Sequence, residues 1–261
     1  MPAGIFSHVK GVLIDINGVL HNDGIPIPGA IEIISLLKER SIPCRFTTNT
    51  TTRTSDDIWK MLRDMGFSVE KSEIITPVQG ALLHLRQLGQ PSCHLLLRDE
   101  LKPAFSEFTH SHTNPDVIVV GDIGDRWNYP IMNHLFQMMV FGAELVALHR
   151  GRYWQVKNEL KLDIGAFIAG LEYASGKEAV VIGKPSKSFF QLPLAEMGIK
   201  PEEAVMIGDD IEMDVGGAQK AGLKGILVKS GKYRPELAAA SKVRPDAILD
   251  SLTDLKKFFI P

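Results

Sequence analysis

Short apolar runs alternate with segments of helical period along the chain, and this alternation constrains the fold more than any other feature. An apolar run at 11–16 is followed by a helical pattern at 29–40, a second run at 43–49 and a second helical pattern at 54–67. This order is typical of parallel strands joined by right-handed helical crossovers. We therefore expect an α/β fold with a Rossmann-like, doubly wound parallel sheet.

The second half of the chain repeats this order. Its apolar runs and helical patterns lie at 178–183, 186–198, 203–208, 214–222 and 224–229. Pro193 falls inside one of the helical patterns and is expected to kink or shorten that helix.

A further α/β unit is predicted between the two halves. Its apolar runs and helical patterns lie at 94–99, 116–122, 129–142, 144–149 and 164–176. We place this insert at 79–182, which leaves 1–78 and 183–261 as one core domain. No Gly/Ser-rich linker marks the borders, so they are inferred from where the chemically informative residues lie.

The composition excludes several classes of protein. A chain of 261 residues, 44% of them hydrophobic, holds one large or two modest domains. The formal net charge of -2 gives no bias toward nucleic acid or membranes, and no run approaches the roughly 18 apolar residues of a membrane span. Two cysteines, Cys44 and Cys93, and an N-terminus without a signal pattern indicate a cytoplasmic protein. We expect neither a nucleic-acid nor a membrane partner.

Polar residues follow four of the apolar runs. They are Asp15, Thr48 with Asn49, Lys184, and Asp209 with Asp210. In a parallel sheet the carboxyl ends of the strands face one crevice, so these side chains are expected to meet there. Three carboxylates would repel one another unless a divalent cation and a cationic side chain share the space. Hard oxygen ligands of this kind suit Mg²⁺, which a substrate phosphate completes.

This grouping predicts chemistry on phosphorus. Thr48, Asn49 and the ammonium group of Lys184 are suitable donors to phosphate oxygens. Asp15 is then left as a nucleophile that would form an aspartyl-phosphate. The expected partner is a small phosphorylated substrate.

Four motifs in this order resemble those of the haloacid dehalogenase superfamily. They are DINGVL, TTN, GKPS and GDDIEMD, and the similarity extends over nearly the whole chain. The resemblance is to phosphatases that carry a large α/β cap, of the C2 type, between the second and third motifs (class IIA, NagD-like). Stretches such as RFTTNTT and ILVKSGKYRP resemble the branch that contains phospholysine phosphohistidine inorganic pyrophosphate phosphatases and related hydrolase-domain proteins.

The resemblance implies a Mg²⁺ site and a phosphatase mechanism. It implies Asp15 as nucleophile and metal ligand, with the backbone carbonyl of Asn17 and the carboxylate of Asp209 as further ligands. Lys184 would neutralise Asp15 and the transferring phosphoryl group.

It also implies roles for residues around these. Thr48 and Asn49, together with Asn17, would bind the phosphoryl group. Asp210 and Asp214, four apart at the start of a helix, would orient metal-bound waters or hold Lys184.

Asn17 departs from the usual pattern of the superfamily. Most of its phosphatases carry a second aspartate here, which protonates the leaving group and then deprotonates the attacking water. An amide does neither, so a typical 10²–10⁴-fold contribution to the rate should be missing. We therefore expect good leaving groups, in pyrophosphate, P–N bonds or activated esters. Deamidation of Asn17-Gly18, or an engineered Asn17, would change this expectation.

Other interpretations of these residues stay open. Asn17-Gly18 is a hairpin-turn signal that would make Asp15 a turn-adjacent acid, and Asp209, Asp210 and Asp214 also suit a helix N-terminus. The whole protein could be a non-catalytic or weakly active phosphate-binding or signalling relative. A phosphoacceptor receiver domain fits poorly in length and motif order, and the acidic metal site argues against a dehalogenase acting on carbon.

The insert is less informative. Arg152, Tyr153 and Trp154 are candidates for gripping a leaving group, although such residues more often pack a loop. His110 and His112 have metal-site spacing but no third ligand nearby in the sequence, which favours surface histidines. The segment FQMMVFG (136–142) suits a core helix or a dimer face, so a homodimer through the cap is one expectation.

Overall fold

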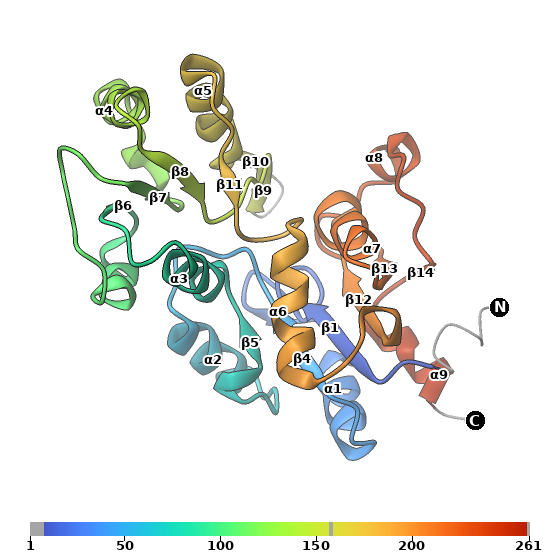
Figure 1. The fold of residues 1–261 in the computed structure, drawn as a ribbon. Helices are drawn as coiled ribbons and strands as arrows, with labels where there is room; N and C mark the ends of the chain where they lie inside the picture. The colour runs from blue at the N-terminus through green and yellow to red at the C-terminus, as the bar shows by residue number, and fades with distance from the viewer. Residues whose placement is uncertain (1–7, 157–158, 260–261) are drawn as a thin grey trace. The chain divides into compact units, whose positions relative to one another are not determined.

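The computed structural model describes residues 8–156 and 159–259, and the chain divides into two compact units (Figure 1). The first unit comprises Met1–Thr48, Ser55–Ile75 and Lys184–Pro261; the second comprises Asn49–Thr54 and Thr76–Gly183. None of the described helices is long and apolar enough to cross a bilayer.

The first unit is built on a six-stranded sheet whose order is β14-β13-β12-β1-β4-β5 and whose neighbouring strands are all parallel. Its strands are β1 (Gly11–Asp15), β4 (Cys44–Thr47), β5 (Ile74–Ile75), β12 (Ala204–Gly208), β13 (Lys224–Val228) and β14 (Ala247–Leu249). β1 and β12 are buried along their whole length, as expected where helices cover both faces of a parallel sheet.

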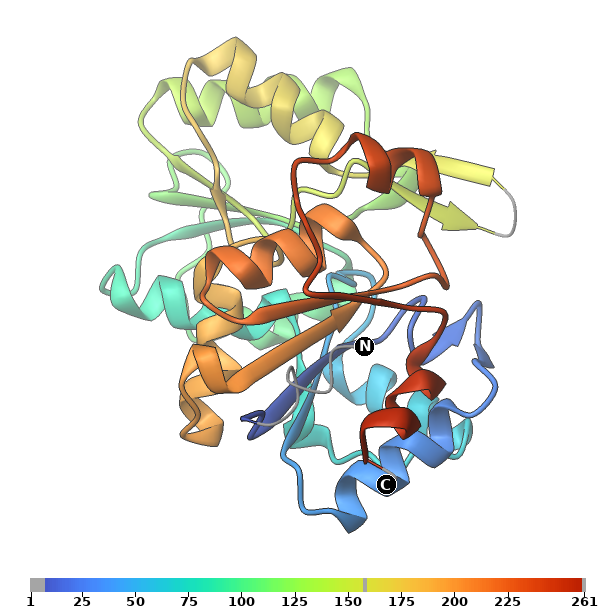
Figure 2. The same ribbon diagram turned by 90° about the vertical axis from the view of Figure 1, so that its right-hand side faces the viewer.

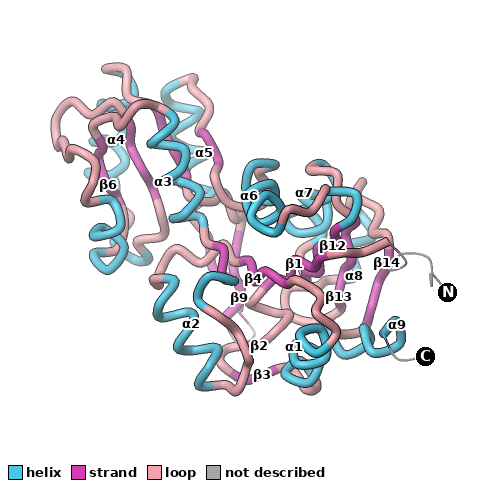
Figure 3. The backbone as a smooth tube through the Cα atoms, turned by 60° about the horizontal axis from the view of Figure 1, so that its bottom comes forward, coloured by secondary structure: helices cyan, strands magenta, loops and turns pink. Residues whose placement is uncertain are grey.

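Helices pack on both faces of this sheet because alternate residues of a strand point to opposite sides. The helices are α1 (Ala30–Glu39), α2 (Ser55–Asp64), α6 (Lys187–Met197), α7 (Gly217–Lys220), α8 (Pro235–Ala240) and α9 (Lys256–Phe259). Val12 and Ile14 share one core with buried residues of α1 and α2, whereas Leu13 shares another with residues of α6 and α7. Figures 2 and 3 show these two helical layers and confirm the doubly wound arrangement.

Two local interpretations can be compared with the structure. The alternative of a hairpin turn at Asn17-Gly18 is wrong, because β1 pairs in parallel with β4 and β12. The hairpin turn lies instead at Asp23-Gly24, between β2 (His21–Asn22) and β3 (Ile25–Pro26), where both turn residues have the positive φ of a type I′ turn. Pro193 does not shorten α6, which continues to Met197. The buried side chains around Pro193 hold the helix to the sheet despite one missing backbone hydrogen bond.

The second unit has its own four-stranded parallel sheet, ordered β11-β8-β7-β6. Its elements are α3 (Pro77–Gln87), β6 (Cys93–Leu96), β7 (Val117–Val120), α4 (Tyr129–Val140), β8 (Glu144–Ala147), α5 (Gly165–Ser175) and β11 (Val180–Val181), with the hairpin β9 (Tyr153–Val156) and β10 (Glu159–Leu162) between β8 and α5. One face of β7 packs with α3 and the other with α4 and α5. The inserted segment therefore folds as an α/β unit, as the sequence predicted.

Candidate active site

Asp15 is the last residue of β1, the strand at which the order of the sheet reverses. β4 and β5 extend the sheet on one side of β1, and β12, β13 and β14 extend it on the other. The connections from β1 and from β12 run to opposite sides of the sheet, which leaves a crevice at the carboxyl ends of these two strands. Open α/β sheets bind ligands at such a crevice. The sheet thus places Asp15 at the position expected for a reactive group.

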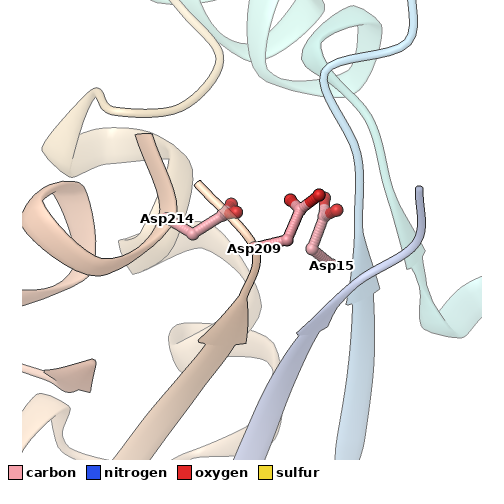
Figure 4. Close-up of side chains that lie close together, drawn as sticks. All are labelled: Asp15, Asp209 and Asp214. Atoms are coloured by element: carbon pink, nitrogen blue, oxygen red, sulfur yellow. The ribbon is translucent and has the colours of Figure 1, made fainter. Parts of the chain in front are cut away.

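Three buried carboxylates gather at this end of the sheet (Figure 4). Asp15 ends β1, Asp209 directly follows β12, and Asp214 lies in the helical turn η5 (Ile211–Gly216). Each of these residues is at most 6% exposed, and one oxygen of each side chain lies within 4.8 Å of the others. Carboxylates so close together in a dry setting need a positive charge between them.

Lys184 supplies one such charge. Its ammonium group is buried, contacts Asp15, and lies 2.7 Å from Asp214. The sequence analysis placed Lys184 at the end of a strand of the same sheet, which is wrong. The run 178–183 contributes β11 to the sheet of the second unit, where it pairs with β8. Lys184 reaches Asp15 because it is the first residue of the first unit after that strand, and its side chain is long.

Asp210 and Asp214 have different surroundings. The side chain of Asp210 caps η5 by accepting hydrogen bonds from the backbone N–H groups of Glu212 and Met213 at 3.1 and 3.0 Å. The backbone N–H of Asp210 donates to Asp214 at 3.1 Å. Asp214 is therefore the member of the pair that contacts Lys184.

Asn17 and Thr48 lie together. The Asn17 amide donates to the Thr48 hydroxyl at 3.4 Å, and the backbone N–H of Thr48 donates to the carbonyl of Ile75 at 3.1 Å, which anchors the end of β4. Thr48 is buried and the Asn17 side chain is exposed. Asn49 begins the segment 49–54 of the second unit, and its phosphoryl contact stays a prediction.

The loop after β13 contributes residues that the sequence analysis did not select. The backbone N–H of Lys232 donates to Asp209 Oδ2 at 2.6 Å, and Ser230 Oγ donates to the carbonyl of Gly18 at 2.5 Å. A Cβ added at Gly231 would lie 2.0 Å from Asp209 Oδ2, and the residue has a positive φ of 58°. The signal was available, because the polar stretch KSGK follows β13 just as polar residues follow β1 and β12.

The electrostatics of the cluster are dominated by burial and by like charges. Burial, followed by repulsion from Asp15 and Asp214, raises the pKa of Asp209 well above its usual range. Burial also raises the pKa of Asp214 to about 7, against the attraction of Lys184. Burial alone would lower the pKa of Lys184, but Asp15 and Asp214 outweigh it and raise that pKa, so the ammonium group stays charged.

Lys232 adds a second positive charge close to the cluster. Its side chain is half-buried, and although burial lowers its pKa, attraction to Asp209, Asp210 and further carboxylates produces a net rise.

The donor set fits a divalent cation. Asp15, Asp209 and Asp214 carry three negative charges and Lys184 one positive charge, so the buried group has a net charge of -2 when all four are ionised. The backbone N–H of Lys232 donates to Asp209 Oδ2, and Oδ1 of the same carboxylate is a further oxygen donor. All-oxygen donors suit Mg²⁺.

The candidate residues of the second unit have local contacts. The Trp154 ring is 40% exposed and lies under the ammonium group of Lys161, 5.9 Å from its centroid. Arg152 is exposed and Tyr153 begins β9. Their contact with a leaving group stays a prediction.

Comparisons with known proteins identify the family. The model of haloacid dehalogenase-like hydrolases matches residues 12–109, and the HAD-hydrolase-like model matches residues 181–255. Phospholysine phosphohistidine inorganic pyrophosphate phosphatase from Bos taurus is 39% identical to this chain over 94% of it and 92% of the relative. The chain belongs to the haloacid dehalogenase-like hydrolases. The resemblance seen in the four motifs is confirmed.

Other members of this family extend the likeness. Haloacid dehalogenase-like hydrolase domain-containing protein 2 from Homo sapiens is 42% identical over 87% of this chain and 86% of the relative. Among solved structures, 4-nitrophenylphosphatase from Thermotoga maritima superposes with a TM-score of 0.90 at 25% identity, covering 97% of this chain and 98% of the other. NagD from E. coli K-12 superposes with a TM-score of 0.84 at 27% identity, covering 94% and 98%. The expected fold class, a Rossmann-like core with an inserted α/β cap, is confirmed.

Proposed function

We propose that this chain is a Mg²⁺-dependent phosphatase that forms an aspartyl-phosphate on Asp15. The observation that carries the proposal is the buried cluster of Asp15, Lys184, Asp209 and Asp214 at the strand where the sheet order reverses. Relatives named as phosphatases, which match nearly the whole chain, support the same activity. The substrate is a small phosphorylated molecule.

The metal would be held by Asp15, Asp209 and the backbone carbonyl of Asn17. When bound, Mg²⁺ offsets the charge of the carboxylates and of the phosphate and stabilises the charge that develops in the transition state. Burial and the neighbouring carboxylates, which raise the pKa of Asp209, make its ionised form unfavourable, and a bound cation would stabilise that form.

The protein groups would act in two steps. A carboxylate oxygen of Asp15 attacks phosphorus, the bond from phosphorus to the leaving group breaks, and Lys184 and Thr48 neutralise or donate to the phosphoryl oxygens. Water then attacks the phosphorus of the aspartyl-phosphate, which releases inorganic phosphate and restores the carboxylate of Asp15. Asp214 holds Lys184 against Asp15 during both steps.

Asn17 sets the preference among substrates. Its amide points toward the Thr48 hydroxyl and carries no acidic proton for a leaving group. We propose that the enzyme favours pyrophosphate, P–N bonds and activated esters, whose leaving groups depart without strong acid assistance. Turnover that is fastest on alkyl phosphomonoesters would contradict this preference.

The decisive experiment is replacement of the nucleophile. Asp15→Asn should abolish Mg²⁺-dependent release of phosphate from pyrophosphate and 4-nitrophenyl phosphate, and should abolish trapping of an acyl-phosphate by hydroxylamine. Asp56→Asn is the matched control, because Asp56 is an exposed carboxylate outside the buried cluster that pairs with Lys71 at 2.7 Å. Retained turnover in Asp15→Asn would exclude Asp15 as nucleophile.

A second candidate is a phosphate-binding or signalling protein that has lost efficient turnover. Asn17 favours this candidate, because a protein that only binds phosphate does not need the aspartate that acts as general acid at this position in most phosphatases of the superfamily. A burst of one bound phosphate per chain without further release would support this candidate over the phosphatase.

The remaining assignments are also proposals. We propose that the second unit is the cap that selects the leaving group, with borders near 79 and 182. We also propose that the protein is cytoplasmic, because both of its cysteines are free and buried. A homodimer through this unit is supported by the exposed side chains of Phe141 and Tyr173. Sedimentation of the full chain tests it.

A further inference from the structure

Three histidines of the second unit lie together, on elements apart from the carboxylate cluster. His94 is in β6, His112 is in the segment that leads into β7, and His134 is in α4. The ring centroids of His94 and His112 are 5.6 Å apart, and those of His94 and His134 are 5.5 Å apart. The sequence offered His110 and His112 as a pair without a third ligand, whereas the fold surrounds His94 with two other rings.

His110 is directed elsewhere. Its Nε2 lies 3.2 Å from the backbone carbonyl of Phe105, and its backbone bridges to Cys93. This histidine is therefore a matched control for its neighbour in the sequence, His112.

The separations of His94 from the two other rings suit a shared ion. Zn–N bonds are about 2.0–2.1 Å long, so imidazoles on one tetrahedral ion have their ring centres roughly 5 Å apart. The two measured separations are close to that value. His112 and His134 are exposed, so their rings turn at little cost. Among the described residues only the three carboxylates place three ligand atoms within 4.8 Å of one another, so a shared ion requires the rings of His112 and His134 to turn toward His94.

His94 is prepared for a ligand by its surroundings. Its Nδ1 lies 3.4 Å from the carbonyl of Ser111, and donation from Nδ1–H to that carbonyl leaves the Nε2 lone pair available. Histidines that bind metals commonly donate their other N–H to a backbone carbonyl in this way. The nearby ammonium group of Lys102 is offset by Asp99 at 2.6 Å.

We propose that His94, His112 and His134 form a binding site for a borderline transition-metal ion such as Zn²⁺, with His94 as a ligand through Nε2. Imidazole donors suit Zn²⁺, Ni²⁺ and Cu²⁺, whereas Mg²⁺ prefers oxygen. The histidine site should therefore not bind Mg²⁺, the ion proposed for the carboxylate cluster. Its residues and its donor atoms also differ from those of that cluster.

The test measures zinc binding by the full chain without an affinity tag. Isothermal titration with ZnCl₂ in excess Mg²⁺ compares the wild type with a variant that combines His94→Asn, His112→Asn and His134→Asn. We expect the wild type to bind one Zn²⁺ more than this variant. Each single substitution should weaken that site at least 10-fold, and His110→Asn should leave it unchanged. Comparison with the combined variant removes any zinc bound at the carboxylates.

A second measurement follows the ring nitrogens directly. With ¹⁵N-labelled histidine, Zn²⁺ should shift the Nε2 signal of His94 and leave its Nδ1 protonated. Equal zinc stoichiometry in the wild type and the combined variant would overturn the proposal, as would an effect of His110→Asn as large as that of His112→Asn. If His94→Asn fails to fold, the exposed positions His112 and His134 still decide the result.

Discussion

Replacing Lys184 by methionine tests the electrostatic account of the site most directly. Methionine has a similar length and keeps the packing of the side chain, but it leaves the buried carboxylates of Asp15 and Asp214 without their shared cation. Burial, followed by repulsion from Asp15 and Asp214, already raises the pKa of Asp209 beside them.

The expected loss follows from the burial of the pair. Removal of one partner of a buried ion pair typically costs about 3–5 kcal/mol, because an uncompensated charge remains in a dry setting. For a chain of this size that corresponds to a fall in Tm of roughly 10 °C. The free energy of unfolding of Lys184→Met should therefore fall by about 3–5 kcal/mol at pH 8 without Mg²⁺.

The sign of the pH dependence follows from the direction of the pKa shifts. Carboxylates whose pKa is raised in the folded state bind more protons folded than unfolded, so their effect on stability becomes unfavourable as the pH rises through the folded pKa. Asp214 shows this direction already in the wild type, with a pKa of about 7. The deficit of Lys184→Met should accordingly be smaller at pH 5 than at pH 8. The proposed Mg²⁺ ion would bind the folded state alone, so adding Mg²⁺ should reduce the deficit.

Urea unfolding followed by circular dichroism measures the effect, with Lys38→Met as control. Lys38 pairs with Glu73 at 2.9 Å, but both side chains are partly exposed, and such pairs contribute about 0–1 kcal/mol. The reasoning would be refuted if the deficit of Lys184→Met were the same at both pH values and with or without Mg²⁺. It would also fail if the deficit were no larger than that of the control.

Three further predictions address the loop, the missing acid and a cysteine. Gly231→Ala should lower kcat at least 10-fold, because the added Cβ would displace Asp209. The control Gly198→Ala has a similar φ of 65° and no atom within 4 Å of its added Cβ, so it should lose stability but keep its kcat. Equal kcat values for the two variants would contradict this prediction. Asn17→Asp should raise turnover of alkyl phosphates by up to about 10²-fold, and unchanged rates in a phosphate-release assay would mean that another group supplies the acid. Burial raises the pKa of Cys44 to about 12, so the thiol of the folded protein should resist iodoacetamide at pH 9 until urea unfolds the chain. For the same reason the free energy of unfolding should fall above pH 9, where the unfolded chain loses the thiol proton. Rapid labelling of the folded protein, seen in peptide mass spectra, would show that the thiol is accessible.

Local patterns sufficed for much of the fold. Val12, Leu13 and Ile14 read as a buried strand because continuous apolar runs suit a parallel sheet covered on both faces, and the structure buries all three. The positions of Asp15 and Asp209 at strand ends followed from the same runs. These features depend only on the spacing of residue types along the chain, which can be read directly from the sequence.

Contacts between distant segments were less accessible. The apolar run before Lys184 looks the same whichever sheet it joins, so the sequence could not show that β11 pairs with β8. Nor could it show that the backbone of Lys232 binds Asp209, because a backbone N–H leaves no trace in residue type. The partners of His94 were hidden for a similar reason, since His112 and His134 lie 18 and 40 residues away.

The amino-acid sequence by itself determined the alternation of strands and helices, the family, and the acidic residues that end β1 and β12. The tertiary structure alone decided which charges face one another: Lys184 bridges Asp15 and Asp214, while Asp210 turns away to cap a helix. The physical reason is range. Hydrophobic periodicity acts between neighbours along the chain, but a buried ion pair forms only where packing brings remote segments together and removes the water between them.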